Sequence, residues 1–439
     1  MTTTRSASMS AERRAPARIA IVTPGTSQFD SRAHRIARSC AAQGDTVTMY
    51  ARREQGMAAE EHVDGYRIVR VPLQPGDFPQ TPGAAPSGGA GRVVASARRF
   101  GRRAWRRVRL AALDTDIGHR LELFPMRPLS WAEPLVQVAE PHDIWHGMWA
   151  GSLPALSRIR SRFGGRTVYD SRDVYLRSRE FDGMPRVQRV FMTALERRWA
   201  KRADAVVTVN DAYARMLAQD LDIAPPPVVR NCPDRWDPPE PRPDRIRELL
   251  GLPGSTRIVL YQGLLITNRG IEQSMHAILE VPDAVLVLMG SGRRDRYAEM
   301  AAGRTFTGKV HVIDAVPPAD LLSWTASSDV MLMAIQPSTT NHLHTTPQKL
   351  WEAMAAGVPV VAADMPGMAA VVEETGCGVV CDPTSPTAIA TAIRSLLDDP
   401  SAMRAAGDRG LAAAHARYNW ATQFEVLDGV YARLLGAAR

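Results

Sequence analysis

Strands and helices alternate along this chain in two series, and a proline-rich stretch separates the two. Apolar runs such as ARIAIVT (17–23) and RIVLYQG (257–263) are typical of strands buried on both faces, and stretches with a helical apolar stripe follow most of them. Alternating strands and helices of these lengths build a parallel sheet that helices cover on both faces. The pattern therefore predicts an α/β fold with two doubly wound domains.

The proline-rich stretch marks the connection between these domains. Eight prolines fall within the nineteen residues 225–243, too many for helix or sheet hydrogen bonding. We predict a disordered tail over 1–16, an N-terminal domain over 17–225, a C-terminal domain over 226–416 and a final crossover helix over 417–439. Hydrophobic residues make up 45% of the 439, which is enough for two buried cores. Two such domains would hold a substrate in the crevice between them, beyond the carboxyl ends of the strands.

The chain lacks the sequence motifs that are typical of several classes of protein. The loop after the first strand reads VTPGTSQFDS, with one glycine, and GSGRRD (290–295) lacks the third glycine of a dinucleotide-binding loop. There is no Gly-x4-Gly-Lys-Ser/Thr phosphate loop and no Gly-x-Ser-x-Gly nucleophile turn. The four cysteines are too scattered for a disulfide framework, and Cys377 and Cys381 have no second Cys/His pair with ligand spacing. We therefore expect no NAD, no metal and no other cofactor.

The densest chemical signal is HTTPQKLWEAMAAGVPVVAA at 344–363. Pro347 suits the first helical position and Thr346 the N-cap, so backbone N–H groups at this end would face a phosphate. Lys349 adds a positive charge there, and Glu352, at least one turn deeper, can accept hydrogen bonds from two ribose hydroxyls. The alternative is an ordinary capped helix with a solvated Lys and Glu. Because only three of the 54 basic residues are lysines, the lysine at this position favours the phosphate site.

This helix and the strand after it resemble the retaining glycosyltransferases of the GT-B fold (group 1, family 4-like), which move a sugar from a nucleotide diphosphate donor. The resemblance covers nearly the whole chain from about Ala17, and PQKLWEAMAAGVPVVA is its most specific part. The supporting segments are VLYQGLLITNRGIE (259–272), VVRNCPD (228–234), DIWHGMWAGSLPAL (143–156) and FDSRAHRIA (29–37). The resemblance implies two Rossmann-like domains with a crevice between them, and a C-terminal helix that returns to the first domain.

On the donor side, the resemblance implies that Glu352 binds the nucleotide ribose. The family neutralises the diphosphate with an Arg-x4-Lys pair, whose Lys position is Arg269 here and whose Arg position is Leu264, so we expect Arg269 and Lys349 to share this work. The family often has a glutamate against the donor sugar eight residues before the ribose glutamate, and this position is His344 here. The expected donor-binding residues are Gly263, Arg269, His344, Thr346, Lys349 and Glu352.

On the acceptor side, DIWHGMWAG places His146 at the carboxyl end of a strand, facing the crevice. A lone histidine is often structural, but its position in the matching motif favours a role near the anomeric carbon. Asp170 ends the next strand and either orients the acceptor or caps the following helix. Asn231, in the linker, is a turn-former or a ligand. The expected catalytic residues are His146, Arg269, Lys349 and Glu352.

The resemblance implies a hexosyltransferase that uses a nucleotide sugar, with retention of anomeric configuration, and we expect a lipid-linked or surface-glycan acceptor. Breaking the anomeric C–O bond leaves negative charge on the diphosphate, and cations aimed at it stabilise the transition state more than the ground state. Because no protein nucleophile is evident, we expect attack on the face of the leaving group. Two other functions remain open: a nucleotide-sugar epimerase or hydrolase of the same fold, and a catalytically silent nucleotide-sugar-binding module at the membrane.

One run of arginines accounts for the net charge of +8, because eight arginines fall between 92 and 109 without an acid. Residues 92–112 also carry apolar side chains at helical spacing, and a basic amphipathic helix with Trp and Phe fits an anionic membrane interface. The expected membrane-facing residues are Arg98, Arg99, Arg102, Arg103, Trp105, Arg106 and Arg107. The alternatives are a core helix with a solvated face and a site for nucleic acid or protein, but no nucleic-acid-binding module accompanies the run, so we expect no nucleic acid partner.

The expected location follows from the absence of two kinds of segment. The chain has no apolar run of about 18 residues that would span a membrane. Its first 16 residues contain no apolar stretch of the kind found in signal peptides. We therefore expect a cytoplasmic protein that is peripheral on the inner face of the plasma membrane.

Overall fold

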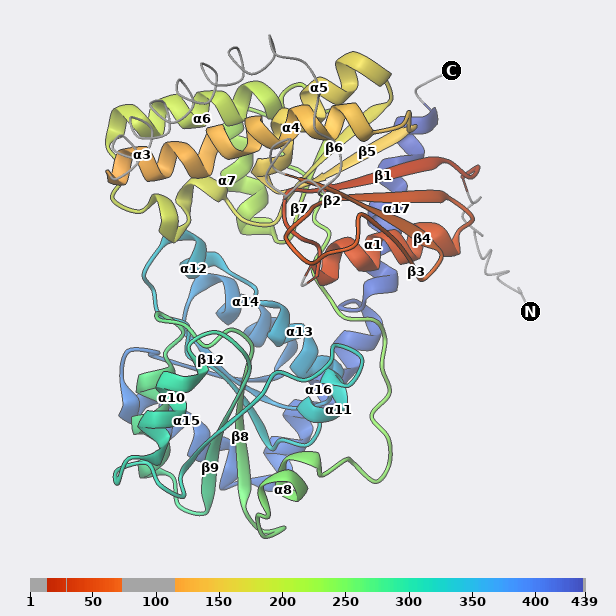
Figure 1. Ribbon diagram of the computed structural model, residues 1–439. Coiled ribbons are helices and arrows are strands. Elements are labelled where there is room, and N and C mark those ends of the chain that lie inside the picture. The colour runs from red at the N-terminus through yellow and green to blue at the C-terminus, as the bar shows by residue number, and fades with distance from the viewer. Residues whose placement is uncertain (1–13, 29, 73–114, 437–439) are drawn as a thin grey trace, which may run out of the picture. The chain divides into compact units, whose positions relative to one another are not determined.

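Seven strands form the first sheet, in the order β3-β4-β2-β1-β5-β6-β7, in a computed structural model that describes residues 14–28, 30–72 and 115–436 (Figure 1). The strands are β1 (Arg18–Thr23), β2 (Thr46–Arg52), β3 (Glu60–Val63), β4 (Tyr66–Val71), β5 (Ile144–Met148), β6 (Arg166–Ser171) and β7 (Ala205–Thr208). β1 pairs in parallel with β2 and β5, β2 with β4, and β5 with β6. The predicted parallel sheet is confirmed.

Strands β3 and β4 form an antiparallel hairpin that the apolar pattern does not predict. Asp64 and Gly65 join them with φ values of 47° and 83°, the left-handed conformation of a tight two-residue turn. The sequence of β3, EEHV, is largely exposed at the edge of the sheet, so it lacks the apolar run by which the other strands are found.

Helices cover both faces of this sheet. On one face α4 (Arg127–Val138) and α5 (Leu153–Phe163) pack around a core that includes Ala20 and Val22 of β1. The neighbouring β1 residues Ile19 and Ile21 point the other way and are equally buried, on the side of α1 (Ser31–Ala42). The other helical segments between Asp116 and Leu221 are α3 (Asp116–Leu121), η1 (Glu122–Met126), η2 (Ala150–Ser152), η3 (Tyr175–Arg177), η4 (Arg179–Phe181), α6 (Arg186–Ala200) and α7 (Asp211–Leu221).

The second sheet has six strands in the order β10-β9-β8-β11-β12-β13, and all five neighbouring pairs are parallel. The strands are β8 (Arg257–Gln262), β9 (Ala284–Met289), β10 (Val310–Ile313), β11 (Val330–Met333), β12 (Val360–Ala363) and β13 (Gly378–Cys381). Ile258 and Leu260 belong to one core, and Val259 and Tyr261 belong to another. Alternate residues of β8 therefore pack on opposite faces, as expected for a doubly wound domain.

The helices of this second series follow the predicted alternation. They are α8 (Arg245–Leu250), α9 (Ile271–Ala277), η5 (Ile278–Glu280), α10 (Arg294–Ala302), α11 (Leu321–Thr325), α12 (Thr340–His344), α13 (Gln348–Ala355), α14 (Pro366–Thr375), α15 (Pro386–Leu397), α16 (Pro400–Ala416) and α17 (Trp420–Gly436). Short or weakly amphipathic helices such as α8, α10, α12 and α14 are not predicted, because they lack a long apolar stripe.

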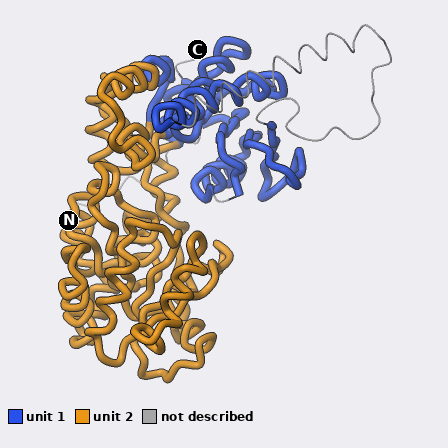
Figure 2. The backbone as a smooth tube through the Cα atoms, turned by 60° about the vertical axis from the view of Figure 1, so that its left-hand side comes forward, with its two compact units in different colours: residues 1–170, 198–206, 428–439 blue, residues 171–197, 207–427 orange. Residues whose placement is uncertain are grey.

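The chain divides into two compact units, coloured separately in Figure 2. Unit 1 contains 1–170, 198–206 and 428–439, and unit 2 contains 171–197 and 207–427. Helix α17 begins in unit 2 and ends in unit 1, as expected for a C-terminal helix that returns to the first domain. The boundaries of these units differ from the predicted domain boundaries, so the domain boundaries stay a prediction.

Two predicted segments fall partly or wholly outside the described residues. The arginine run at 92–112, with all seven expected membrane-facing residues, lies outside them, and so do residues 1–13 of the predicted tail. Arg14, in contrast, donates hydrogen bonds to Asp45 (2.7 Å) and Asp428 (2.7 Å), so the disordered tail does not extend to this residue. Within the described ranges, no helix is long and apolar enough to cross a membrane.

Candidate functional site

The loop after β8 brings a glycine against a lysine from another element of unit 2. Gly263 has a φ of 115°, a conformation that other residues rarely adopt. A Cβ atom on Gly263 would lie 3.4 Å from Nζ of Lys349 on α13. The glycine therefore leaves room for a ligand beside the Lys349 ammonium, at the end of β8 where the sequence predicts the diphosphate.

Helix α13 begins one residue later than predicted. Gln348 is its first residue, and Pro347, with extended backbone (ψ 148°), occupies the N-cap without a side-chain hydrogen bond. The prediction that Thr346 caps the helix is therefore wrong. The Thr346 hydroxyl instead accepts a hydrogen bond from the Asn210 amide (3.4 Å), which also donates to the carbonyl of His344 (3.1 Å). A contact of Thr346 with the donor stays a prediction.

The Lys349 ammonium lies over the aromatic ring of Tyr261. Its Nζ atom is 3.9 Å from the centroid of the Tyr261 ring, and it makes no hydrogen bond or ion pair with any described residue. Burial, reinforced by the charge of Arg269 and opposed by that of Glu352, lowers the pKa of Lys349 to about 7. An anion bound here would relieve the cost of burying this charge.

Arg269 supplies the second cation of this region. Its side chain is half-buried, and in the part of the chain that the structure describes its guanidinium makes no hydrogen bond or ion pair. Its charge is close enough to lower the pKa of Lys349, so the two cations expected to bind the diphosphate share one environment. Leu264, the position where the family has its arginine, is 49% exposed, and its carbonyl accepts a hydrogen bond from the Tyr261 hydroxyl (2.9 Å).

Glu352 is 6% exposed, and both of its carboxylate oxygens accept hydrogen bonds. The side-chain amide of Gln262 donates to Oε2 (2.6 Å), and that of Gln348 donates to Oε1 (2.8 Å). Gln262 in turn accepts from the Thr325 hydroxyl (2.8 Å), and Gln348 accepts from the Asn231 amide (2.9 Å). Asn231 is thus a hydrogen-bonding partner of the site residues, and the solvated-Glu alternative does not hold.

His344 is the last residue of α12 and is half-buried. Its pKa is lowered by burial and by the charges of Arg215 and Arg177. The imidazole is therefore biased toward its neutral form, which can both donate and accept hydrogen bonds. Its predicted contact with the donor sugar stays a prediction.

In unit 1, His146 belongs to a fully buried polar network. Arg32 of α1 donates to both oxygens of Asp170 (2.7 and 3.2 Å), and all four members, including Tyr431, have no exposed surface. His146 Nε2 lies 3.2 Å from Asp170 Oδ2, and the Tyr431 hydroxyl lies 2.8 Å from Nδ1. Because a carboxylate only accepts, Nε2 donates to Asp170, and in the neutral imidazole Nδ1 then accepts from the Tyr431 hydroxyl.

Charge keeps the carboxylate of this network ionised. Burial alone would raise the pKa of Asp170, but the Arg32 guanidinium and the hydrogen bond from His146 hold it well below its usual range. Burial also raises the pKa of Tyr431 well above its usual range, so its hydroxyl keeps the proton it donates. These charge states support the direction of both hydrogen bonds to His146.

Two predictions about this network need correction. His146 is the third of five residues in β5, not the last, and both of its ring nitrogens are occupied by protein groups. Asp170 does not cap a helix, because its carboxylate is engaged by Arg32 and His146. A role of either residue toward an acceptor stays a prediction.

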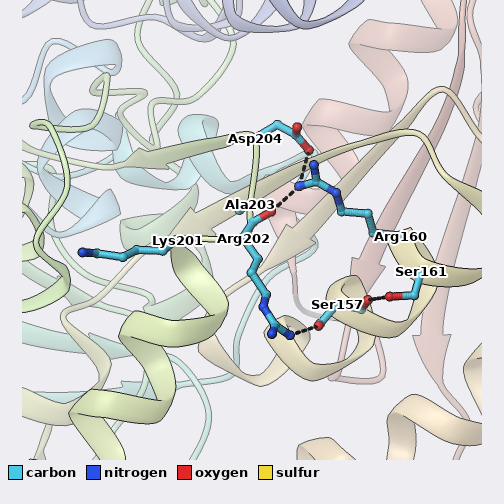
Figure 3. Close-up of a pocket in the computed structure, with 7 residues that line it drawn as sticks. All are labelled: Ser157, Arg160, Ser161, Lys201, Arg202, Ala203 and Asp204. Carbon is cyan, nitrogen blue, oxygen red and sulfur yellow. Dashed lines mark hydrogen bonds and ion pairs between the residues drawn. The ribbon is translucent and has the colours of Figure 1, made fainter.

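Unit 1 also has a surface cavity of about 710 Å³ (Figure 3). It is lined by Ser157, Arg160, Ser161, Lys201, Arg202, Ala203 and Asp204. Figure 3 shows that Arg160 bonds Asp204 and the Arg202 carbonyl, while Arg202 reaches Ser157. No predicted site residue is among the lining residues, and its arginines are already engaged, so we do not place the reaction there.

The sequence reasoning identifies the charged residues of the site and misses their partners. Gln262, Gln348 and Thr325 carry no distinctive chemistry, and only the tertiary fold brings them to Glu352. Arg32 and Tyr431 lie 114 and 285 residues from His146 along the chain, too far for a local motif to join them. The only available signal for Arg32 is its position within the matching segment FDSRAHRIA.

Family models match most of the chain in two parts. Residues 30–233 match the model described as a glycosyl transferase 4-like domain, and residues 243–411 match the model described as glycosyl transferases group 1. Both agree with the family that the sequence motifs indicate.

Known proteins similar to the chain include glycosyltransferases. The GDP-mannose-dependent alpha-(1-6)-phosphatidylinositol monomannoside mannosyltransferase of Mycolicibacterium smegmatis is 30% identical over 299 residues, which are 64% of this chain and 75% of that protein. The D-inositol 3-phosphate glycosyltransferase of Corynebacterium diphtheriae is 27% identical over 252 residues, 54% of this chain, and the match spans only 57% of that relative's length. Sucrose-phosphate synthase from Thermosynechococcus elongatus has the same fold, with a TM-score of 0.72 at 17% identity over 96% of this chain and 100% of that one.

Proposed function

Because this chain belongs to the group 1 glycosyltransferases, we propose that it transfers a hexose from a nucleoside diphosphate sugar to an acceptor with retention of anomeric configuration. One observation carries the proposal. The cations Lys349 and Arg269 share one environment, and neither has a hydrogen-bonding or ion-pair partner among the described residues. Lys349 lies beside Gly263, which has a positive φ. The buried carboxylate of Glu352 lies one helical turn from Lys349. This arrangement suits a diphosphate next to a ribose.

The charges of the site favour departure of the diphosphate. When the anomeric C–O bond breaks, positive charge develops on the sugar and negative charge on the leaving oxygen. Lys349 and Arg269 bind the more highly charged transition state better than the ground state, without a metal. Attack by the acceptor on the same face as the leaving group would retain the configuration.

The acceptor we propose is a lipid-linked or surface glycan, or a related polyhydroxylated compound. Two relatives are named for inositol 3-phosphate and phosphatidylinositol mannoside acceptors, which supports a cyclitol or its lipid-linked glycoside as the first class to test. Asp170 and His146 of unit 1 would act on this acceptor through a rearranged network, since their polar atoms are engaged in this structure.

We also propose peripheral contact with an anionic membrane, on the inner face of the plasma membrane. The arginine run at 92–109 supports it from the sequence. Helix α6 adds a second observation, because its Val187, Val190 and Phe191 are 83%, 63% and 51% exposed at helical spacing. Co-sedimentation with vesicles, with and without anionic lipid, tests this proposal, and equal recovery with both kinds of vesicle would contradict it.

Turnover with a panel of nucleotide sugars tests the transferase proposal. Release of nucleoside diphosphate that rises with added acceptor supports transfer, release without acceptor indicates a hydrolase, and binding without release indicates a silent module. Glu352→Ala and Arg269→Ala should abolish turnover while the circular dichroism spectrum is unchanged. A fully active Glu352→Ala protein would overturn the assignment of the site.

A further inference from the structure

The surface cavity of unit 1 lies at the amino ends of the neighbouring strands β6 and β7. Its lining residues come from α5 and from residues 201–204, which directly precede β7. Asp204 donates its backbone N–H to the carbonyl of Thr167 (2.8 Å), near the start of β6. Parallel α/β domains bind their substrates at the opposite edge of the sheet, beyond the carboxyl ends of the strands. A ligand of this cavity would therefore be additional to the proposed transfer reaction.

Positive charge dominates the lining of the cavity. Two arginines and a lysine stand against one carboxylate, that of Asp204. This carboxylate is also paired with Arg166 (3.3 Å), and it accepts hydrogen bonds from the backbone N–H (2.8 Å) and the hydroxyl (2.9 Å) of Thr167. Asp204 is thus bound from the side of β6, and the lining keeps two positive charges in excess.

Both arginines of the cavity are fixed through one nitrogen. Arg160 uses Nη1 for the Asp204 carboxylate (3.1 Å) and for the carbonyl of Arg202. Figure 3 shows Arg202 reaching from the turn after α6 to the Ser157 hydroxyl on α5, to which its Nη1 donates (3.4 Å). Across the ranges that the structure describes, neither guanidinium bonds through Nε or Nη2. Because a guanidinium carries five N–H donors, each arginine is held in place and can still bind an anion.

These groups suit a phosphate monoester. Guanidinium N–H groups match the oxygens of a phosphate in pairs. The Ser157 hydroxyl accepts from Arg202 and donates to no residue that the structure describes, so its proton is available to a phosphate oxygen. A phosphate monoester carries about two negative charges near pH 7, which matches the excess positive charge of the lining. The cavity volume of about 710 Å³ lies within the usual range for small ligands, roughly 300–1,000 Å³.

We propose that this cavity binds a phosphate monoester through Arg160, Arg202 and Ser157. The ligand is either a free phosphorylated compound or the headgroup of a membrane lipid, because both present the same chemical group. A merely basic surface would attract anions according to its total charge, whichever arginine supplies it. A site of defined geometry depends on the arginines that line it.

Calorimetric titration of the full chain with glycerol 3-phosphate, at constant ionic strength, tests the proposal in solution. Arg202→Gln should weaken binding at least about tenfold, the effect of one lost hydrogen bond between charged groups. The circular dichroism spectrum should be unchanged, since the bond that Arg202 donates to Ser157 is long (3.4 Å).

Arg158→Gln is the matched control. It removes the same charge from α5, but Arg158 donates to the Leu129 carbonyl (2.9 Å) and does not line the cavity, so binding should match that of the unmodified protein. Equal affinities in the Arg202→Gln and Arg158→Gln variants would overturn the proposal. Arg269→Gln should also bind normally, because Arg269 belongs to unit 2. Loss of binding in this variant, with Arg202→Gln unaffected, would place the anion at the proposed donor site and overturn the proposal as well.

Co-sedimentation with phosphatidylcholine vesicles, with and without phosphatidic acid, distinguishes the two sources of the phosphate. Phosphatidic acid presents the same monoester on a membrane. Recovery that requires phosphatidic acid, and that falls in Arg202→Gln but not in Arg158→Gln, assigns the cavity to a lipid headgroup. The same dependence on Arg202 with glycerol 3-phosphate alone assigns it to a free compound. If Arg202→Gln changes neither measurement, the cavity is not a phosphate site.

Discussion

Lys349 holds its ammonium nitrogen 3.9 Å from the centroid of the Tyr261 ring. The face of the ring carries partial negative charge and attracts the cation, but it offers no acceptor that matches the three N–H groups. Burial and the charge of Arg269 lower the pKa of Lys349 to about 7, so the charge of this side chain changes within the physiological range. A bound diphosphate would restore the full charge.

The affinity for a nucleotide sugar should therefore fall as the pH rises from 6 to 8.5. Below pH 7 the free protein already carries the ammonium, whereas above pH 7 it must take up a proton to pair with the diphosphate, which costs roughly a factor of thirty over this range. Calorimetry with the donor identified in the panel measures this, because its diphosphate diester does not titrate there. Lys349→Arg keeps a permanent charge and should lose the pH dependence; the same dependence in this variant would contradict the assignment to Lys349.

Gly263→Ala should weaken donor binding as well as stability. The new Cβ would be forced into a φ of 115° and would lie 3.4 Å from Lys349 Nζ, so we expect a stability loss of about 1–3 kcal/mol and a weaker donor complex. Thermal unfolding and calorimetry measure the two effects. Gly308→Ala is the control, since Gly308 also has a positive φ (78°) but nothing lies within 4 Å of its Cβ position. Loss of donor affinity in both variants would show that strain alone is responsible.

The sheets and the site were predictable to different degrees. Long apolar runs identify nearly all parallel strands, because such strands are buried on both faces and need no partner's sequence to be recognised. β3 is not predicted, because an exposed edge strand can have a polar sequence such as EEHV. The helix α13 begins one residue later than predicted, because Pro347 has extended backbone and lies outside the helix. The position of β3 and the start of α13 therefore depend on the surrounding structure as well as on the local sequence.

In the site, the charged groups are predictable and the groups that hold them are not. Lys349 and Glu352 stand out by composition and by a motif, and both belong to one polar environment in the structure. Gln262 lies 90 residues from Glu352 along the chain, and Tyr431 lies 285 residues from His146. Glutamine and tyrosine occur in many structural roles, so their type alone does not indicate a hydrogen-bonding partner. These pairs are recognised only in the three-dimensional structure, because no periodicity in the sequence relates the two residues of a pair.

We expect turnover to survive removal of divalent cations. Arg269 and Lys349 provide the positive charge that a metal would otherwise supply to the diphosphate. Within residues 14–28, 30–72 and 115–436, which the structure describes, no group of three or more His, Cys, Asp or Glu could hold a metal ion. Initial rates in EDTA, followed by added Mg²⁺ or Mn²⁺, measure the effect. A rate that falls in EDTA and returns with either metal would refute this account.

Replacing Tyr431 by phenylalanine should destabilise unit 1. The variant leaves Nδ1 of the fully buried His146 without the donor that now lies at 2.8 Å, which costs about 1–3 kcal/mol. Urea unfolding measures the change. Tyr418→Phe, which removes a hydroxyl bonded to the exposed part of Glu374, is the comparison and should cost less. Equal losses in the two variants would mean that the His146 bond adds nothing to stability.

Removing the charge of Asp170 should have the largest effect on stability and should change how the protein responds to acid. Asp170→Asn removes the carboxylate charge that now pairs with the buried Arg32 guanidinium (0% exposed), a loss of about 3–5 kcal/mol. The pKa of Asp170 is held below its usual 3.8, so the carboxylate stabilises the folded state above about pH 4, and this contribution is lost as the pH falls further. Urea unfolding should therefore show a large difference in stability between Asp170→Asn and the unmodified protein at pH 7 and a smaller difference at pH 3.

Asp143→Asn is the control, because Asp143 forms an exposed ion pair with Arg18 (3.5 Å). This variant should lose less than about 1 kcal/mol of stability at either pH. A difference between Asp170→Asn and the unmodified protein that grows as the pH falls would contradict the ionised, arginine-paired state of Asp170.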